Sequence, residues 1–193
     1  MKSQSHRATL IASAAALALV GCGGPPGVLG GTDTKTLSGS YARPGQLVTF
    51  GITLDPPESS KTVSLVSVSS VELQHPMEIV SIRAIRPSEY GSTLGGVLDD
   101  PAKHATGVFK PHPVSEITLL PRSVPDWQVI VTLRCSRFGK YRVKGFEFRY
   151  KVDGTDGSEF LPRAMELQVI DCKRSHPVEA DFVCSGGQLL PRR

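Results

Sequence analysis

The stretch WQVIVTLRCSRFGKYRVKGFEFRYKV, residues 127–152, determines the fold class of this chain. From Trp127 to Cys135 every second residue is apolar or a cysteine, which is the alternation of a half-buried β-strand. A second alternation ends at Gly145, where the apolar phase shifts to the even-numbered positions up to Val152. A glycine at a phase change inside a strand indicates a bulge. These residues therefore predict consecutive antiparallel strands with a bend at the glycine.

The same alternation recurs on both sides of this stretch and predicts further strands over residues 46–54, 62–73, 78–86, 116–120, 160–161 and 165–170. The apolar phase slips within 62–73, which indicates a bulge or a crossing between sheets. No segment carries a helical stripe of apolar residues over three turns. About seven or eight short strands separated by turn residues predict an all-β fold, a β-sandwich, with a small barrel as the alternative.

The run from Trp127 through the Gly-x-Tyr-x-Val stretch at 139–143 to Tyr150 resembles the late strands of immunoglobulin-like extracellular domains. The resemblance covers about 25 residues. It implies that the predicted fold is an immunoglobulin-like β-sandwich, in which the aromatic residues of these strands pack in the core.

The N-terminal residues MKSQSHRATLIASAAALALVGC predict where in the cell the chain is located. Lys2 and Arg7 form a basic region before an uncharged apolar run over residues 8–20. This run is shorter than the roughly 20 residues that a membrane-spanning helix needs, and it has the length of a signal-peptide core. The ending Leu19-Val20-Gly21-Cys22 resembles the lipobox of bacterial lipoproteins. The resemblance implies cleavage before Cys22, fatty acylation of that cysteine, for example with palmitate, and a location on the extracytoplasmic face of a bacterial membrane. An ordinary secretory signal is the alternative.

The composition divides the chain into three parts. Residues 1–21 are the expected signal peptide, and residues 22–40 are the lipidated cysteine followed by a Gly-, Pro- and Ser-rich segment, expected to be a flexible tether. Residues 41–193 are long enough for one β-sandwich domain. Within this domain, residues 86–113 contain glycines and prolines without a strand pattern, and such long irregular segments are often functional.

The charge pattern argues against a nucleic-acid partner. Without Lys2 and Arg7 the chain has 20 basic and 18 acidic residues, and the basic residues are scattered except for seven between 134 and 151. A nucleic-acid-binding surface needs concentrated positive charge with aromatic platforms. The basic run between 134 and 151 is expected to be a solvated strand face, with contact to anionic lipid headgroups as the alternative.

Three cysteines follow Cys22, and an oxidising compartment permits disulfides among them. Cys172 and Cys184 enclose a short loop and are the expected pair, with Cys135 paired to Cys172 as the alternative. Closing such a loop stabilises a fold by about 3 kcal/mol in the chain-entropy model. Cys135 would then remain buried or reactive.

A candidate binding loop lies in the irregular segment over residues 90–113. Its members are expected to be exposed aromatic, basic and histidine side chains that could contact a partner: Tyr90, Lys103, His104, Phe109, Lys110 and His112. A flexible insertion without function is the alternative.

A metal site is the alternative of another class. Histidine, methionine and cysteine are ligands of envelope copper proteins, and the candidate ligands here are His75, Met77, His104 and His112. These residues lack the clustered spacing of a blue-copper site, so no metal or other cofactor is expected.

Hydrolase chemistry has little support. The sequence lacks the Gly-x-Ser-x-Gly and Ser-x-x-Lys motifs, and its paired carboxylates coincide with turn residues. We therefore expect no catalytic residues. The expected function is a membrane-anchored, non-enzymatic binding or accessory module of the cell envelope. Its partner, beyond the membrane lipid, would be an envelope protein, a polymer or a small ligand.

Overall fold

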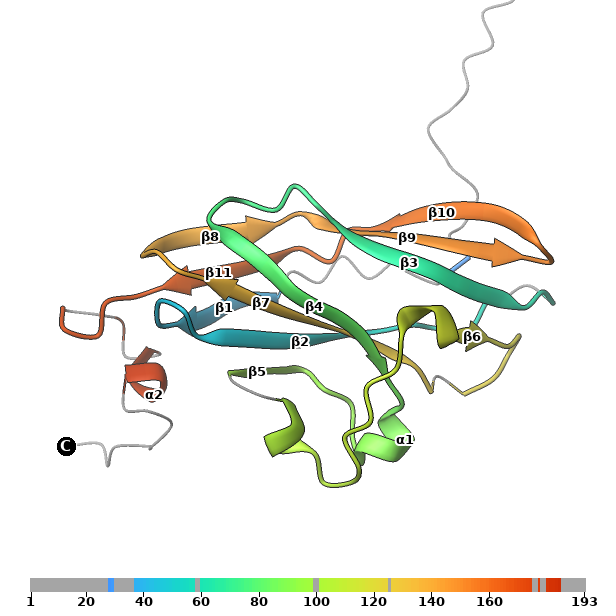
Figure 1. The fold of residues 1–193 in the computed structure, drawn as a ribbon, viewed down its shortest axis with the longest axis horizontal. Helices are drawn as coiled ribbons and strands as arrows, with labels where there is room; N and C mark the ends of the chain where they lie inside the picture. The colour runs from blue at the N-terminus through green and yellow to red at the C-terminus, as the bar shows by residue number, and fades with distance from the viewer. Residues whose placement is uncertain are drawn as a thin grey trace, which may run out of the picture.

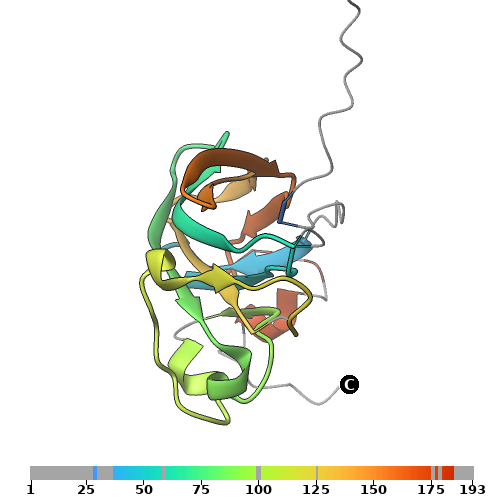
Figure 2. The same ribbon diagram turned by 90° about the vertical axis from the view of Figure 1, so that its right-hand side faces the viewer.

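The computed structural model describes residues 28–29, 37–57, 60–98, 101–124, 126–174, 177 and 180–184. The chain is almost entirely β, with 48% strand and 10% helix. Its strands form two layers packed face to face (Figures 1 and 2). This arrangement confirms the predicted all-β sandwich.

The first layer is a four-stranded antiparallel sheet in the order β4-β7-β2-β5. Its strands are β4 (Met77–Ile85), β7 (Gln128–Cys135), β2 (Leu47–Thr53) and β5 (Gly96–Leu98). The central strand β7 is buried along seven of its eight residues, more than the predicted half-buried strand, because a second apolar cluster containing Ile130 covers its other face.

The second layer joins two smaller sheets, β10-β9-β3-β6 and β1-β11-β8. The strands are β10 (Thr155–Leu161), β9 (Gly145–Val152), β3 (Val63–Val71), β6 (Thr118–Leu119), β1 (Leu37–Ala42), β11 (Met165–Val169) and β8 (Gly139–Val143). Only Lys144 separates β8 from β9, and three residues separate β10 from β11, so one long bent hairpin runs through both sheets. All pairs are antiparallel except β1 with β11, which is parallel.

The connectivity is that of an immunoglobulin-like sandwich. Strands β2, β7 and β4 occupy the B, E and D positions of one sheet, and β3, β8/β9 and β10/β11 occupy the C, F and G positions of the other. The Tyr141 hydroxyl donates a hydrogen bond of 2.8 Å to the Phe138 carbonyl oxygen. A tyrosine that bonds back to the backbone at this corner is a hallmark of the fold. The stretch forms β8, and the Tyr141 ring is half-buried against the core. The hydrogen bond of its hydroxyl was not predicted from the sequence.

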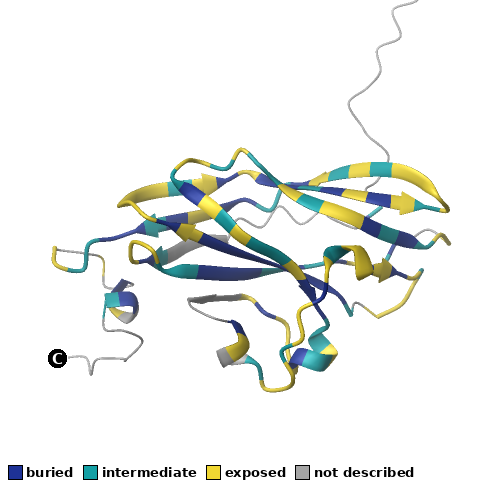
Figure 3. Cartoon of the chain, viewed as in Figure 1, coloured by how far each residue is buried: buried dark blue, intermediate teal, exposed yellow. Residues whose placement is uncertain are grey.

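The core lies between the layers, where the inner strand faces are buried (Figure 3). Phe50 of β2 and Phe146 of β9 meet across it with ring centroids 5.7 Å apart. Burial of such rings contributes most of the hydrophobic stabilisation of a small domain. The alternating pattern thus places one face of each layer against the other.

The helical segments are short. They are α1 (Pro87–Tyr90), α2 (Asp181–Cys184) and the two 3-10 turns η1 (Pro101–His104) and η2 (Val114–Glu116). Pro87 begins α1, where its missing N–H costs nothing, and Gly91 ends it in the left-handed conformation with φ 93°. Among the described residues there is no helix with the length and apolar character needed to span a membrane.

The structure refines the strand predictions. The described residues contain eleven strands where seven or eight were expected, because long alternating runs are split and the two strands β1 and β5 were not recognised. The predicted bulge in 62–73 lies between Leu65 and Ser67. A bulge between Ile79 and Ser81 of β4 was not predicted.

The segment expected to be a tether differs from the prediction. Leu29 is buried in the main core and β1 begins at Leu37, inside the range 22–40. The composition concealed both features, since glycine and proline around Leu29 dominate the local average. Cys22 and the predicted signal peptide lie outside the described residues.

Candidate binding surface

Tyr90 was expected to be an exposed member of the binding loop, and this expectation is wrong. Only 2% of the residue is exposed, and its hydroxyl donates a hydrogen bond of 2.9 Å to the Pro101 carbonyl oxygen. It packs with Ile85, Leu94 and Ile130 in a second apolar cluster beneath the segment. The ring therefore fixes the segment to the sandwich and is not available to a partner.

The buried amide of Gln128 fixes the same segment from β7. Its Oε1 accepts the Leu94 N–H at 2.8 Å, and its Nε2 donates to the Leu94 carbonyl oxygen at 2.8 Å. This side chain thus pairs with a backbone residue as a neighbouring strand would. Gln128 stands at one of the alternate positions that the strand pattern leaves to the opposite face, so no local pattern marked its role.

The other members of the predicted loop have different surroundings. Phe109 is half-buried against Tyr90 in an edge-to-face contact with centroids 6.1 Å apart, whereas Lys110 is exposed. Lys103 and His104 belong to η1, and their side chains lie outside the description. Tyr90 and Phe109 therefore contact each other and do not form the exposed aromatic pair that was expected.

His112 is a buried member of a charged cluster. Its Nδ1 lies 2.8 Å from Glu116 Oε2 and its Nε2 lies 3.2 Å from Glu89 Oε2. The ring edge contacts Trp127, over which the Arg86 guanidinium stacks at 4.4 Å. Both imidazole nitrogens are occupied from opposite sides, so the cluster connects the segment to the sheet.

Three of the four candidate metal ligands, His75, Met77 and His112, do not come together, and the side chain of His104 lies outside the description. His75 and Met77 lie at the start of β4, while His112 pairs with Ala84 near its end. Seven residues of extended strand separate these points by about 23 Å. The Met77 side chain is buried in the core. Within the described ranges no group of three histidine, cysteine or acidic residues could hold a metal ion.

A groove lies on the outer face of β8 and β11. Its volume is about 330 Å³, and it is lined by Gln74, Lys140, Tyr141, Arg142, Glu166, Leu167 and Gln168. Two smaller hollows, of about 260 and 270 Å³, continue it along β8 toward Lys144 and toward Arg174. This size is at the lower end of the range for ligand-binding clefts.

Alternation along β8 places three cations on this face, at Lys140, Arg142 and Lys144. Lys144 is paired with Glu72 at 2.8 Å. The side chains of Lys140 and Arg142 make no ion pair with any of the described residues, although Glu166 is the cross-strand neighbour of Arg142. The groove therefore contains two cationic side chains without an ion-pair partner among the described residues, Lys140 and Arg142, beside the carboxylate of Glu166.

The sequence contained a signal for this surface. The basic run between 134 and 151 was expected to be a solvated strand face, and its alternation with Tyr141 and Val143 already placed the cations together. No sequence pattern indicated that Gln74, from the connection between β3 and β4, forms one wall of the groove. Burial raises the pKa of the Tyr141 phenol, and the neighbouring Cys135 adds to this rise.

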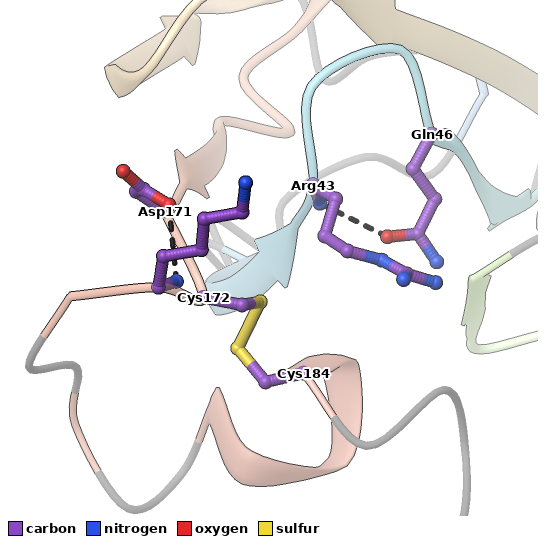
Figure 4. Close-up of a disulfide and its surroundings, with 6 residues drawn as sticks. Arg43, Gln46, Asp171, Cys172 and Cys184 are labelled. Atoms are coloured by element: carbon purple, nitrogen blue, oxygen red, sulfur yellow. Dashed lines mark hydrogen bonds between the residues drawn. A yellow bond between two sulfur atoms is a disulfide. The ribbon is translucent and has the colours of Figure 1, made fainter.

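The disulfide joins Cys172 to Cys184 with their Cα atoms 5.3 Å apart, as expected from the sequence. It lies beside Arg43 of the β1–β2 turn, at the end of the sandwich toward which the groove extends (Figure 4). Asp171 accepts the Lys173 N–H at 3.0 Å and pairs with Arg174 at 3.4 Å. Cys135 is a free, buried thiol.

The chain matches no protein-family model and no curated protein. Among solved structures it is similar to the VesB protease of Vibrio cholerae, with 12% sequence identity and a TM-score of 0.37. The match covers 70% of this chain and 30% of the protease, and similarity this weak carries no argument about function.

Proposed function

We propose that the chain is a lipid-anchored, non-enzymatic binding module of the cell envelope, attached through acylated Cys22. The basic and apolar regions of residues 1–20 and the lipobox-like Leu19-Val20-Gly21-Cys22 support this address. Two or more acyl chains give stable anchoring, whereas one holds a protein only weakly.

The groove on β8 and β11 is the proposed binding surface, and its ligand is an anionic segment of an envelope protein or polymer. The observation that carries this proposal is the pair Lys140 and Arg142, which line a concave surface without an ion-pair partner among the described residues. An arginine can bind a carboxylate or phosphate through two parallel hydrogen bonds. The side-chain amides of Gln74 and Gln168 add neutral donors and acceptors to the same lining.

Fractionation of cells tests the anchor. Cys22→Ser should move the protein from the membrane fraction to the soluble fraction, because the acyl chains that anchor it would be absent. Mass spectrometry of the purified wild type should show a mature chain that begins with an acylated Cys22. A variant that remains fully in the membrane fraction would contradict the anchor.

Crosslinking in cells followed by mass spectrometry tests the groove. The variant Lys140→Glu/Arg142→Glu should lose a partner that the wild type captures. The control Arg83→Glu/Lys110→Glu makes the same charge change at exposed positions outside the groove. Loss of the partner in the control alone would move the binding surface to the segment carrying Lys110, and capture unchanged in both would contradict the proposal.

A further inference from the structure

The first described residues fix the chain to the fold close to the proposed anchor. Leu29 is 1% exposed and belongs to the same core as the two layers. Its backbone N–H donates a hydrogen bond of 3.0 Å to Glu159 Oε2 of β10. Burial of a leucine side chain stabilises a fold, so this contact docks the N-terminal segment on the domain.

The docking point limits the distance between the anchor and the domain. Seven residues lead from Cys22 to Leu29, and a fully extended chain covers at most about 3.6 Å per residue. The lipidated cysteine is therefore within about 25 Å of the docking point. A free tether from Cys22 to residue 40 would allow about 65 Å.

The docking point lies nearer to one end of the sandwich than to the other. From Glu159 to the start of β10 at Thr155 is about 13 Å of strand, whereas ten residues, three of them outside any strand, lead from Glu159 to the end of β11 at Val169. Figure 1 shows the β9–β10 turn and the disulfide-bonded α2 at opposite ends of the molecule. The short chain from Cys22 to Leu29 therefore places the anchor closer to the β9–β10 turn than to the disulfide end.

We propose that Leu29 orients the domain on the membrane, with the β9–β10 turn toward the bilayer and the groove and disulfide end directed outward. This inference rests on the proposed acylation of Cys22. It makes the occupant of the groove a partner in the surrounding medium or the cell wall, since lipid headgroups are at the other end.

Fluorescence quenching on vesicles tests the orientation. The lipidated protein is reconstituted into vesicles of phosphatidylcholine and phosphatidylglycerol that carry a headgroup quencher. A fluorophore is attached to a cysteine introduced as Asp156→Cys beside the β9–β10 turn, or as Ser136→Cys beside the β7–β8 turn. Both positions are exposed, and the buried Cys135 is protected from labelling in the folded protein. The unsubstituted chain measures background labelling.

The label at 156 should be quenched at least threefold more than the label at 136. Leu29→Asp should reduce this difference, because a charged side chain cannot remain in the apolar core. Glu159→Gln, which keeps an acceptor for the Leu29 N–H, should preserve it. Equal or inverted quenching in an acylated protein, or no effect of Leu29→Asp, would overturn the orientation while leaving the anchor intact. Absence of an acyl group on Cys22 in mass spectrometry would overturn both proposals.

Discussion

Gln74 pairs with Arg142 as a strand residue would, although it belongs to the connection between β3 and β4. Its N–H donates to the Arg142 carbonyl oxygen at 3.2 Å, and its side-chain Oε1 accepts the Arg142 N–H at 2.8 Å. Together with the bond from the Lys144 N–H to the Val71 carbonyl oxygen, at 3.1 Å, this pairing covers the outer edge of β8. Uncovered edges invite pairing with other chains, so Gln74 both protects the edge and forms a wall of the groove.

Gln74→Ala should lower the free energy of unfolding by about 1 kcal/mol, the usual contribution of a hydrogen bond. It should also increase self-association, because the Arg142 N–H at the strand edge becomes available to another chain. Chemical denaturation and analytical ultracentrifugation measure the two effects. Gln168→Ala, on the paired strand β11, is the matched control and should leave association unchanged. If the Gln74 variant matched the wild type in both unfolding free energy and self-association, the outer edge of β8 would not depend on its pairing with Gln74.

Tyr90 should make stability sensitive to alkaline pH. Burial raises the pKa of its phenol above the ordinary value of 10.0, so the folded protein keeps a proton that the unfolded chain has begun to lose. The stabilisation is therefore complete below pH 10 and is lost as the pH rises through the pKa of the folded state. Tyr150 adds to the same effect, because burial, and then the charge of Glu159, raise its pKa.

Tyr90→Phe should lose less stability than the wild type as the pH rises through and above 10, the ordinary pKa of the phenol. At neutral pH it should be less stable by about 1 kcal/mol, because the hydrogen bond to the Pro101 carbonyl oxygen is absent. Thermal unfolding across this pH range measures both changes. Tyr41→Phe, at a half-buried position of β1, makes the same chemical change elsewhere. Parallel pH profiles for wild type and Tyr90→Phe would contradict the prediction.

His112→Ala should destabilise the domain by about 2 kcal/mol. The change removes two hydrogen bonds to charged groups, leaves Glu89 and Glu116 without their common partner, and uncovers the edge of Trp127. Urea denaturation followed by the fluorescence of Trp127, the only tryptophan, measures the loss directly. Ser115→Ala, at an exposed neighbouring position, should stay within about 0.5 kcal/mol of the wild type.

Gly145→Ala should destabilise the bend between β8 and β9. A Cβ atom there would lie 2.5 Å from the Leu161 carbonyl oxygen and 2.7 Å from the Phe160 ring, so the paired strand would have to move. Overpacking of this kind costs about 2 kcal/mol. Gly95→Ala is the matched control, since a Cβ at that position has no atom within 4 Å. Equal denaturation midpoints for the two variants would show that the bend tolerates a side chain.

Cys172→Ser should expose one additional thiol and lower the melting temperature. The wild-type chain, unfolded without reductant, should show the thiol of Cys135 from its described cysteines, and the variant should also show Cys184. The loss of the crosslink should cost about 3 kcal/mol. Thiol titration in denaturant and calorimetry check the two parts, with Cys135→Ala as a variant that leaves the crosslink in place. An unchanged thiol count in the Cys172 variant would contradict the pairing.

The sequence by itself determined the fold class. Alternation over residues 127–152 is a local property that any buried strand must satisfy, and it predicted the strands, the bend at Gly145 and the bulge in 62–73. The short spacing of Cys172 and Cys184 likewise identified the disulfide, because two cysteines close in sequence meet without help from the rest of the fold. These features depend on neighbours along the chain.

The tertiary structure alone decided which residues face a partner. Tyr90 and His112 belong to a segment that is irregular in sequence, but distant residues such as Gln128 and Trp127 fix them in place. Leu29 lies in a segment of flexible composition, yet it docks against β10, which is 130 residues away. Gln74 reaches β8 across 68 residues to complete the groove. Contacts over such separations arise from the packing of the two layers, and no local pattern of residues encodes them.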